Sequence, residues 1–166
     1  MYEETGHRPN AGRTLESNDR RKIMEMTSPA FGHEGKIPEK FTCQGKDVNP
    51  ELRIEDIPEG TASLALIIDD PDAPSKTWLH WMVYDIPAGT NVIEEDSVPG
   101  TEGSNDFGKR EYGGPCPPSG EHRYYFRAFA LDEELGLDEG KTRSEVEEAM
   151  KGHVIGNCEM MARYGK

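Results

Sequence analysis

The sequence predicts an all-β sandwich with one short helix, and three observations lead to that fold class. From Ile23 onward, short apolar or alternating runs are separated by proline and glycine, which is typical of strands in a sandwich rather than of helices in a bundle. The run Leu-Ala-Leu-Ile-Ile at 64–68 is apolar at consecutive positions, as in a central strand that is covered on both faces. A convincing helical pattern occurs only near residues 142–151.

Strands are expected at seven places, which in chain order are residues 23–27, 39–43, 52–56, 63–69, 78–86, 123–131 and 154–164. One face of the sixth strand is apolar and is entered by His122, so this histidine is expected on the core side. In the helix at 142–151, Thr142 can cap the first turn and Glu145 follows three residues later. Gly152 is expected to end this helix.

The domain organisation follows from length and composition. Residues 1–21 are expected to form a disordered tail, because they hold four hydrophobic residues without periodicity and their four acids balance four arginines. Residues 22–166 then form a single domain, which is the expected number for a chain of 166 residues. The long segment 94–120 is rich in glycine and proline, and a loop of that length suggests function.

The charge excludes some classes of partner. With 19 lysines and arginines against 32 aspartates and glutamates, the formal net charge is -13. Binding to nucleic acid or to an anionic membrane surface through a basic face is therefore not expected. No stretch approaches the roughly 18 to 20 apolar residues of a membrane span, and the N-terminus lacks the pattern of a signal peptide. We expect a cytoplasmic protein without a cofactor.

Three segments could together carry chemistry. The run Asp-Asp-Pro-Asp-Ala-Pro at 69–74 follows the buried strand and would by itself be read as a turn. In Trp-Leu-His-Trp at 78–81, Trp78 and His80 share a face, close to the aspartate turn if the two strands are neighbours. The segment 112–124 is stiff at its prolines, allows close approach at its glycines and leads into the next strand, as the rim of a pocket would.

These motifs resemble the phosphatidylethanolamine-binding proteins, also called Raf kinase inhibitor-like proteins, in their bacterial and archaeal branch. The resemblance rests on Asp-Pro-Asp-Ala-Pro at 70–74, Trp-x-His at 78–80 and Gly-Pro-x-Pro-Pro-x-Gly-x-His-Arg-Tyr at 114–124, and it covers residues 23–166. It implies two antiparallel sheets with a few short helices, and a small pocket at one end that holds anions such as phosphate or phosphorylethanolamine without known catalysis. The implied pocket residues are Asp70, Ala73, Pro74, Trp78, His80, Gly114, Pro115, Pro118, His122 and Tyr124.

The chemistry of these residue types agrees with anion binding. Two imidazoles and the Tyr124 hydroxyl can donate to phosphate oxygens, and Asp70 can orient a histidine. We therefore expect a non-enzymatic binding protein for a small anionic or phosphorylated ligand. The competing expectation is a protein-interaction module that inhibits a kinase or a serine protease with the same end of the sandwich. A homodimer is left open.

Two other kinds of site would use the same residues. His80, His122, Asp70 and Asp72 have the composition of a metal site. A hydrolase could use Cys116 with His122 as its base, or Ser119, but Cys116 stands between prolines and no Gly-x-Ser-x-Gly elbow exists.

The remaining cysteines and histidines carry weaker expectations. Cys43, Cys116 and Cys158 allow at most one bridge, which would join Cys43 to Cys116, although free thiols are slightly favoured in a reducing cytoplasm. No partner is expected for the histidines at 7, 33 and 153, and the acidic run 132–134 is expected to be a solvated turn rather than a calcium site.

Overall fold

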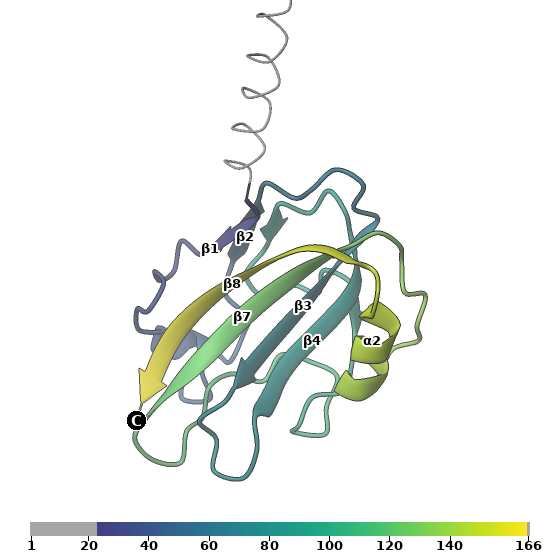
Figure 1. Ribbon diagram of the computed structural model, residues 1–166. Coiled ribbons are helices and arrows are strands. Elements are labelled where there is room, and N and C mark those ends of the chain that lie inside the picture. Colours follow the sequence, from purple (N-terminus) through teal and green to yellow (C-terminus); the bar gives the residue numbers. More distant parts are fainter. Residues whose placement is uncertain (1–22, 166) are drawn as a thin grey trace, which may run out of the picture.

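The computed structural model describes residues 23–165, and these form two antiparallel sheets (Figure 1). The small sheet has the order β1-β2-β5 and the large sheet the order β6-β4-β3-β7-β8. The strands are β1 (Glu25–Thr27), β2 (Leu52–Glu55), β3 (Ser63–Asp70), β4 (Trp78–Pro87), β5 (Val92–Ile93), β6 (Thr101–Glu102), β7 (Glu121–Leu131) and β8 (Val154–Gly165). A 3-10 helix, η1 (Glu39–Phe41), and one α-helix, α2 (Arg143–Met150), complete the fold. The all-β prediction is confirmed, and the predicted tail at 1–21 lies outside the described residues.

The large sheet is covered on both faces, which explains why every residue of β3 is buried. Leu64, Leu66 and Ile68 belong to the core between the two sheets, whereas Ala65 and Ile67 belong to a second core beneath α2. Figure 1 shows α2 against one side of the large sheet. The consecutive apolar run therefore predicted a central strand correctly, because each of its faces packs against a different layer.

The helix begins where the sequence predicts. Thr142 accepts a hydrogen bond from the Glu145 N–H, and the Glu145 carboxylate accepts one from the Thr142 N–H, which is a complete capping box. The helix ends at Met150, and Gly152 follows with a φ of +84°. Within residues 23–165, no helix has both the length and the apolar character needed to cross a membrane.

Two neighbouring aspartates at the end of β3 serve opposite faces of the large sheet. Asp69 is buried and accepts hydrogen bonds at 2.8 Å from Arg127 of β7 and at 2.8 Å from Arg143 of α2. Asp70 is also buried, and its carboxylate pairs with His122 on the other face. Asp69 therefore attaches the helix to the sheet, while Asp70 belongs to the site described below.

The strand predicted at 39–43 is wrong. Residues 39–41 form η1, in which the N–H of Phe41 donates to the carbonyl of Pro38 and that of Thr42 to the carbonyl of Glu39. The Thr42 hydroxyl closes the same turn by donating to the Glu39 carbonyl at 2.8 Å. The two-residue strands β5 and β6 were not predicted, because two residues carry no periodicity.

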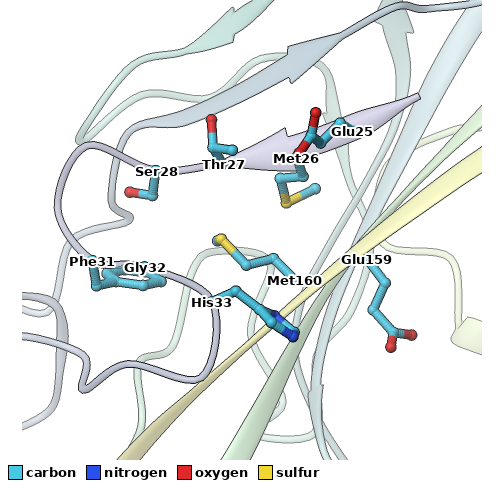
Figure 2. A pocket seen from close by; sticks show the side chains of 9 residues that line it. All are labelled: Glu25, Met26, Thr27, Ser28, Phe31, Gly32, His33, Glu159 and Met160. Atoms are coloured by element: carbon cyan, nitrogen blue, oxygen red, sulfur yellow. The ribbon is translucent and has the colours of Figure 1, made fainter. Parts of the chain in front are cut away.

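The seam between the sheets is partly open along β1 and β8, which are edge strands of the small and large sheets. Segment 33–37 covers the C-terminal half of β8, where the Arg163 N–H donates to the Gly35 carbonyl at 2.8 Å. Farther toward the start of β8 lies a cavity of about 490 Å³ between the two edges (Figure 2). Its walls include Met26 of β1 and Met160 of β8.

Candidate functional site

A cavity of about 230 Å³ lies where β3 ends and where β4 and β7 begin. Asp70 of β3 is opposite Trp78 of β4, and Asp69 is opposite Tyr125 of β7, so the three motifs meet at one edge of the large sheet. The residues that line the cavity are Asp70, Ala73, Pro74, Ser75, Trp78, His80, Phe107, Cys116, Pro117, Pro118, His122 and Tyr124. Eight of the ten predicted pocket residues are among them, and the other two, Gly114 and Pro115, are not.

His122 is held by a buried carboxylate. Its Nδ1 lies 2.7 Å from Oδ2 of Asp70, and both side chains are at most 10% exposed. The other carboxylate oxygen of Asp70 accepts a hydrogen bond from the Asp72 N–H at 2.7 Å. Because Nδ1 donates to Asp70, Nε2 is the ring atom of His122 that remains for a ligand, and it is a donor when the ring is protonated.

His80 is oriented in a different way. Its Nδ1 donates to the carbonyl of Gly113 at 2.6 Å, and burial lowers the pKa of the ring despite the opposing effects of that carbonyl and of Asp70. At neutral pH this histidine is uncharged, and its Nε2 is an acceptor. Donation to an anion by both imidazoles stays a prediction, and for His80 it requires protonation of a ring whose pKa burial lowers.

Tyr124 carries a hydroxyl that is buried and has no hydrogen-bond partner among the described residues. Burial, together with the charge of Asp70, raises its pKa, so the hydroxyl stays protonated. The ring packs edge-on against His80, with 5.3 Å between the centroids. An unpaired buried hydroxyl costs about 1 to 3 kcal/mol, which a ligand oxygen in the cavity would recover.

Phe107 completes an aromatic wall that sequence reasoning missed. Its ring centroid lies 5.6 Å from that of Trp78 and 5.4 Å from that of His80, in both cases edge-on. It belongs to the long 94–120 segment, where no periodicity distinguishes a pocket residue from a solvated one. Ser75, Cys116 and Pro117 were missed as lining residues although they lie inside or beside the recognised motifs.

The loop around Gly114 and Pro115, which leads into the cavity wall, is attached by hydrogen bonds to the segment after η1. The N–H of Gly114 donates to Oδ1 of Asp47 at 2.7 Å, and the carbonyl of Pro115 accepts from the Cys43 N–H at 3.1 Å. Gly114 and Pro115 thus hold the loop in place rather than line the cavity.

Cys43 and Cys116 form a disulfide across the same contact. The predicted pair is correct, and the preference for free thiols is wrong, because the fold brings the two Cα atoms to 5.4 Å, within the range of a bridge. Cys116 therefore offers no thiol nucleophile in this structure, which removes the basis of the hydrolase alternative at that residue.

Replacing Gly114 by alanine is expected to destabilise the protein by about 1 to 3 kcal/mol and to weaken ligand binding. A Cβ atom at this position would clash with the Phe41 carbonyl oxygen, so the loop would have to move. Thermal unfolding of the variant checks the effect. Gly89→Ala is the control, because its Cβ would have no atom within 4 Å and should leave the midpoint unchanged.

Asp72 forms a multiple hydrogen-bond contact with Arg123. Its carboxylate accepts two hydrogen bonds from the Arg123 guanidinium, at 2.9 and 2.8 Å, and a third from the Arg123 N–H. These bonds lower the pKa of Asp72 to about 2 against the opposing effect of burial. These bonds connect the turn after β3 to the start of β7, next to His122.

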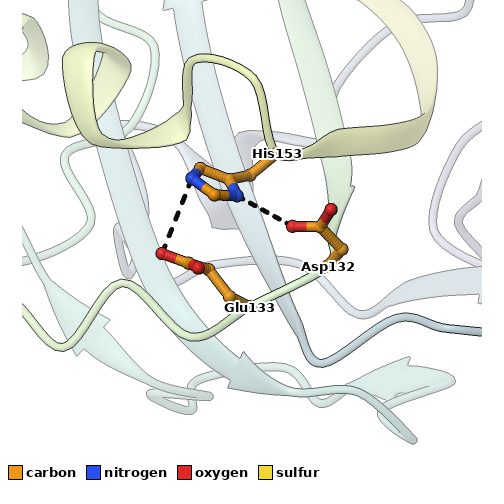
Figure 3. A group of neighbouring side chains, drawn as sticks. All are labelled: Asp132, Glu133 and His153. Carbon is orange, nitrogen blue, oxygen red and sulfur yellow. Dashed lines mark hydrogen bonds and ion pairs between the residues drawn. The ribbon is translucent and has the colours of Figure 1, made fainter.

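The metal alternative is not favoured by the arrangement of its donors. Among residues 23–165, the group of three donors close enough to share an ion is Asp132, Glu133 and His153 (Figure 3), and not the predicted set around His80 and His122. His153 Nδ1 lies 2.8 Å from Asp132, and Nε2 lies 3.6 Å from Glu133.

The expectation of histidines without partners is therefore wrong for His153. It is also wrong for His33, whose Nδ1 accepts a hydrogen bond from the Met161 N–H at 3.2 Å. The histidine at position 7 lies outside the described residues.

Comparison with known proteins gives a consistent assignment. A family model described as phosphatidylethanolamine-binding protein matches residues 27–165. A UPF0098 protein of Methanothermobacter thermautotrophicus is 44% identical over 149 residues, covering 85% of this chain and 98% of the relative. The UPF0098 protein of Aquifex aeolicus is 48% identical over 151 residues, covering 86% and 88%.

Solved structures give the same result. The crystal structure of a phosphatidylethanolamine-binding protein homolog from Chlamydia trachomatis superposes with a TM-score of 0.85 at 40% identity, covering 87% of this chain and 99% of the other. YbcL of Escherichia coli, described as a new member of the mammalian family, gives 0.80 at 30% identity, with coverage of 86% and 98%.

Proposed function

The chain belongs to the phosphatidylethanolamine-binding protein family, and from this premise we propose that the cavity at the end of β3 binds a small anionic or phosphorylated group without chemical change. The observation that carries the proposal is the Tyr124 hydroxyl, which is buried, protonated and without a partner among the described residues. Such a donor can be satisfied by a ligand oxygen in the cavity.

The other groups that line the cavity favour a ligand with two chemically different ends. When its ring is protonated, His122 donates from Nε2 to an anionic oxygen, while the neutral His80 ring accepts from a protonated oxygen or from an ammonium group. Trp78 and Phe107 supply an apolar wall for the organic part of the ligand. This division favours a singly substituted phosphoryl or carboxyl compound over a bare inorganic ion.

Affinity is expected to be modest. The formal net charge of -13 repels an anion at long range, so the attraction must come from the few donors inside the cavity. Dissociation constants on the order of μM to mM are expected for small anions.

The decisive experiment is calorimetric titration with phosphorylethanolamine of the wild type, Tyr124→Phe and Tyr125→Phe. Tyr124→Phe is expected to weaken binding about tenfold, the value of one hydrogen bond to a charged group. Its thermal midpoint should be equal to or above that of the wild type, because the lost hydroxyl had no protein partner among the described residues.

Tyr125 is the matched control, since it is the next residue on β7 and lies on the opposite face, beside Arg123. Equal affinities for Tyr124→Phe and the wild type would contradict the proposal. A loss of binding in Tyr125→Phe of the same size would show that the effect is not specific to the cavity.

Inhibition of a kinase or a serine protease by the same end of the sandwich is the second candidate. It is favoured by Phe107, which is 42% exposed at the rim and could enter a partner's surface. In a panel of such enzymes, inhibition that survives His122→Ala but is lost in Phe107→Ala would assign the effector role to the rim rather than to anion binding.

A further inference from the structure

The open half of the β8 edge has the features of a strand-docking site, and it lies apart from the anion cavity. In a strand, successive residues direct their backbone N–H and C=O groups alternately to the two sides. The Arg163 N–H and the Met161 C=O face away from β7 and bond to Gly35 and Glu34 of the covering segment. By the same alternation, Asn157 and Glu159 direct their backbone groups to this edge.

No backbone or side-chain hydrogen bond from the described residues reaches the outward backbone groups of Asn157 and Glu159. The edge is also neither short nor twisted away by a bulge at these positions, because the pairing with β7 runs without interruption from Gly156 to Gly165. Exposed apolar side chains at Val154 and Ile155, 42% and 40% accessible, extend the same strand. A strand whose outward backbone groups have no strand partner is a template for another strand.

Beside this edge lies the cavity of about 490 Å³ between β1 and β8. Figure 2 shows the side chains of Met26 and Met160 pointing toward one another across it, with Phe31 at one side. All three are buried, and methionine adapts readily to the shape of an entering side chain. The cavity can therefore receive an apolar residue from a strand laid along β8.

The charges around the edge indicate which other side chains a strand bound along β8 would carry. Glu25 of β1 and Glu159 of β8 both line the cavity, and Glu159 is half exposed beyond its bond to Arg127. Residues that face each other in neighbouring strands project to the same side of the sheet. A strand added to β8 would thus place one residue beside Glu159 and the next toward the cavity with Met160.

We propose that the edge of β8 at residues 157–159 binds an extended segment of a partner protein in which basic and apolar residues alternate. The basic side chains lie on the side of Glu159, and an apolar side chain enters between Met26 and Met160. A second copy of this chain is a poor occupant, because it would bring two proteins of charge -13 and two Glu159 side chains together.

The test uses the synthetic peptide acetyl-Arg-Val-Arg-Leu-Arg-Val-amide, its analogue that is N-methylated at alternate residues, and a peptide with glutamate in place of arginine. Binding is followed by fluorescence anisotropy and by amide chemical shifts of the full chain. The first peptide is expected to bind and to shift the amides of residues 157–159, and the N-methylated peptide to bind about tenfold more weakly, since it lacks the strand hydrogen bonds. The glutamate peptide should not bind.

Substitutions in the protein test the same contacts independently of changes in the peptide. Asn157→Pro removes an outward N–H, which edge strands tolerate, and should weaken binding about tenfold. Asn157→Ala keeps that N–H and should bind like the wild type. Glu159→Lys should reverse the preference between the arginine and glutamate peptides, whereas Glu148→Lys on α2 should not.

Several outcomes would overturn the proposal. One is equal binding of the plain and N-methylated peptides, a comparison that leaves the protein unchanged. Another is binding that appears only after residues 1–22 are deleted, which would assign the edge to the chain's own terminus. A dimer that dissociates as the peptide binds would assign it to a second copy. Anion binding in Tyr124→Phe and wild type is measured separately, so failure here leaves the proposed function untouched.

Discussion

Reduction of the disulfide between Cys43 and Cys116 is expected to lower the free energy of unfolding by about 4 kcal/mol. The bridge joins positions 73 residues apart, so it removes a large loop-closure entropy from the unfolded chain. Guanidinium unfolding with and without a phosphine reductant measures the difference. The Cys43→Ala, Cys116→Ala double variant should unfold like the reduced wild type and should not respond to reductant.

The same reduction should also weaken anion binding, because Cys116 lines the cavity and the bridge holds its wall against the segment after η1. Two hydrogen bonds remain at this contact, from the Gly114 N–H to Asp47 and from the Cys43 N–H to the Pro115 carbonyl, and they are expected to preserve part of the affinity. Unfolding midpoints that do not change with reductant would contradict this account of the bridge.

Sulfate affinity is expected to increase as the pH falls from 8 to 5.5, by at most about tenfold per pH unit for the uptake of one proton. A bound anion stabilises the protonated form of an imidazole that donates to it, so anion binding is coupled to the uptake of a proton. His80 should contribute little in this range, because burial lowers its pKa. Isothermal titration at several pH values gives the slope, and sulfate keeps its own charge throughout.

His122→Gln is expected to abolish this slope while the protein stays folded. A metal ion at the same residues would behave in the opposite way, since ligation needs neutral imidazole and acid releases the ion. Affinity that is flat or rises with pH, or binding that a chelator removes, would reject the anion mechanism.

The stability of the unliganded protein should decrease as the pH falls, because of His80. Its pKa in the folded state lies below that of the unfolded chain, so the unfolded chain takes up more protons. Stability is therefore fully present above about pH 6.5 and declines as the pH falls toward the folded-state value. Acid weakens the empty protein and strengthens its complex.

Features with a local cause were predictable from the sequence. The capping box of Thr142 and Glu145 and the consecutive apolar residues of β3 each express a rule that operates within a few residues. The pocket residues were predicted because three motifs resembled those of a family, and eight of them do line one cavity.

Features that depend on tertiary contacts were not predictable. Phe107 reaches the cavity only through the path of a long loop, and the uncharged state of His80 follows from its burial beneath the Gly113 carbonyl. The strand expected at 39–43 has an apolar pattern but no neighbouring strand, so the turn that starts at Pro38 prevails.

The paired aspartates at the end of β3 have a consequence for how the chain finds its register during folding. A slip of one residue would put either Ile68 or Pro71 where a carboxylate now lies, so either His122 or the pair of Arg127 and Arg143 would lose its acidic partner. The same slip would move Leu64, Leu66 and Ile68 out of the core between the two sheets. Charge and apolar packing therefore select the same register, and both decide which aspartate pairs with His122.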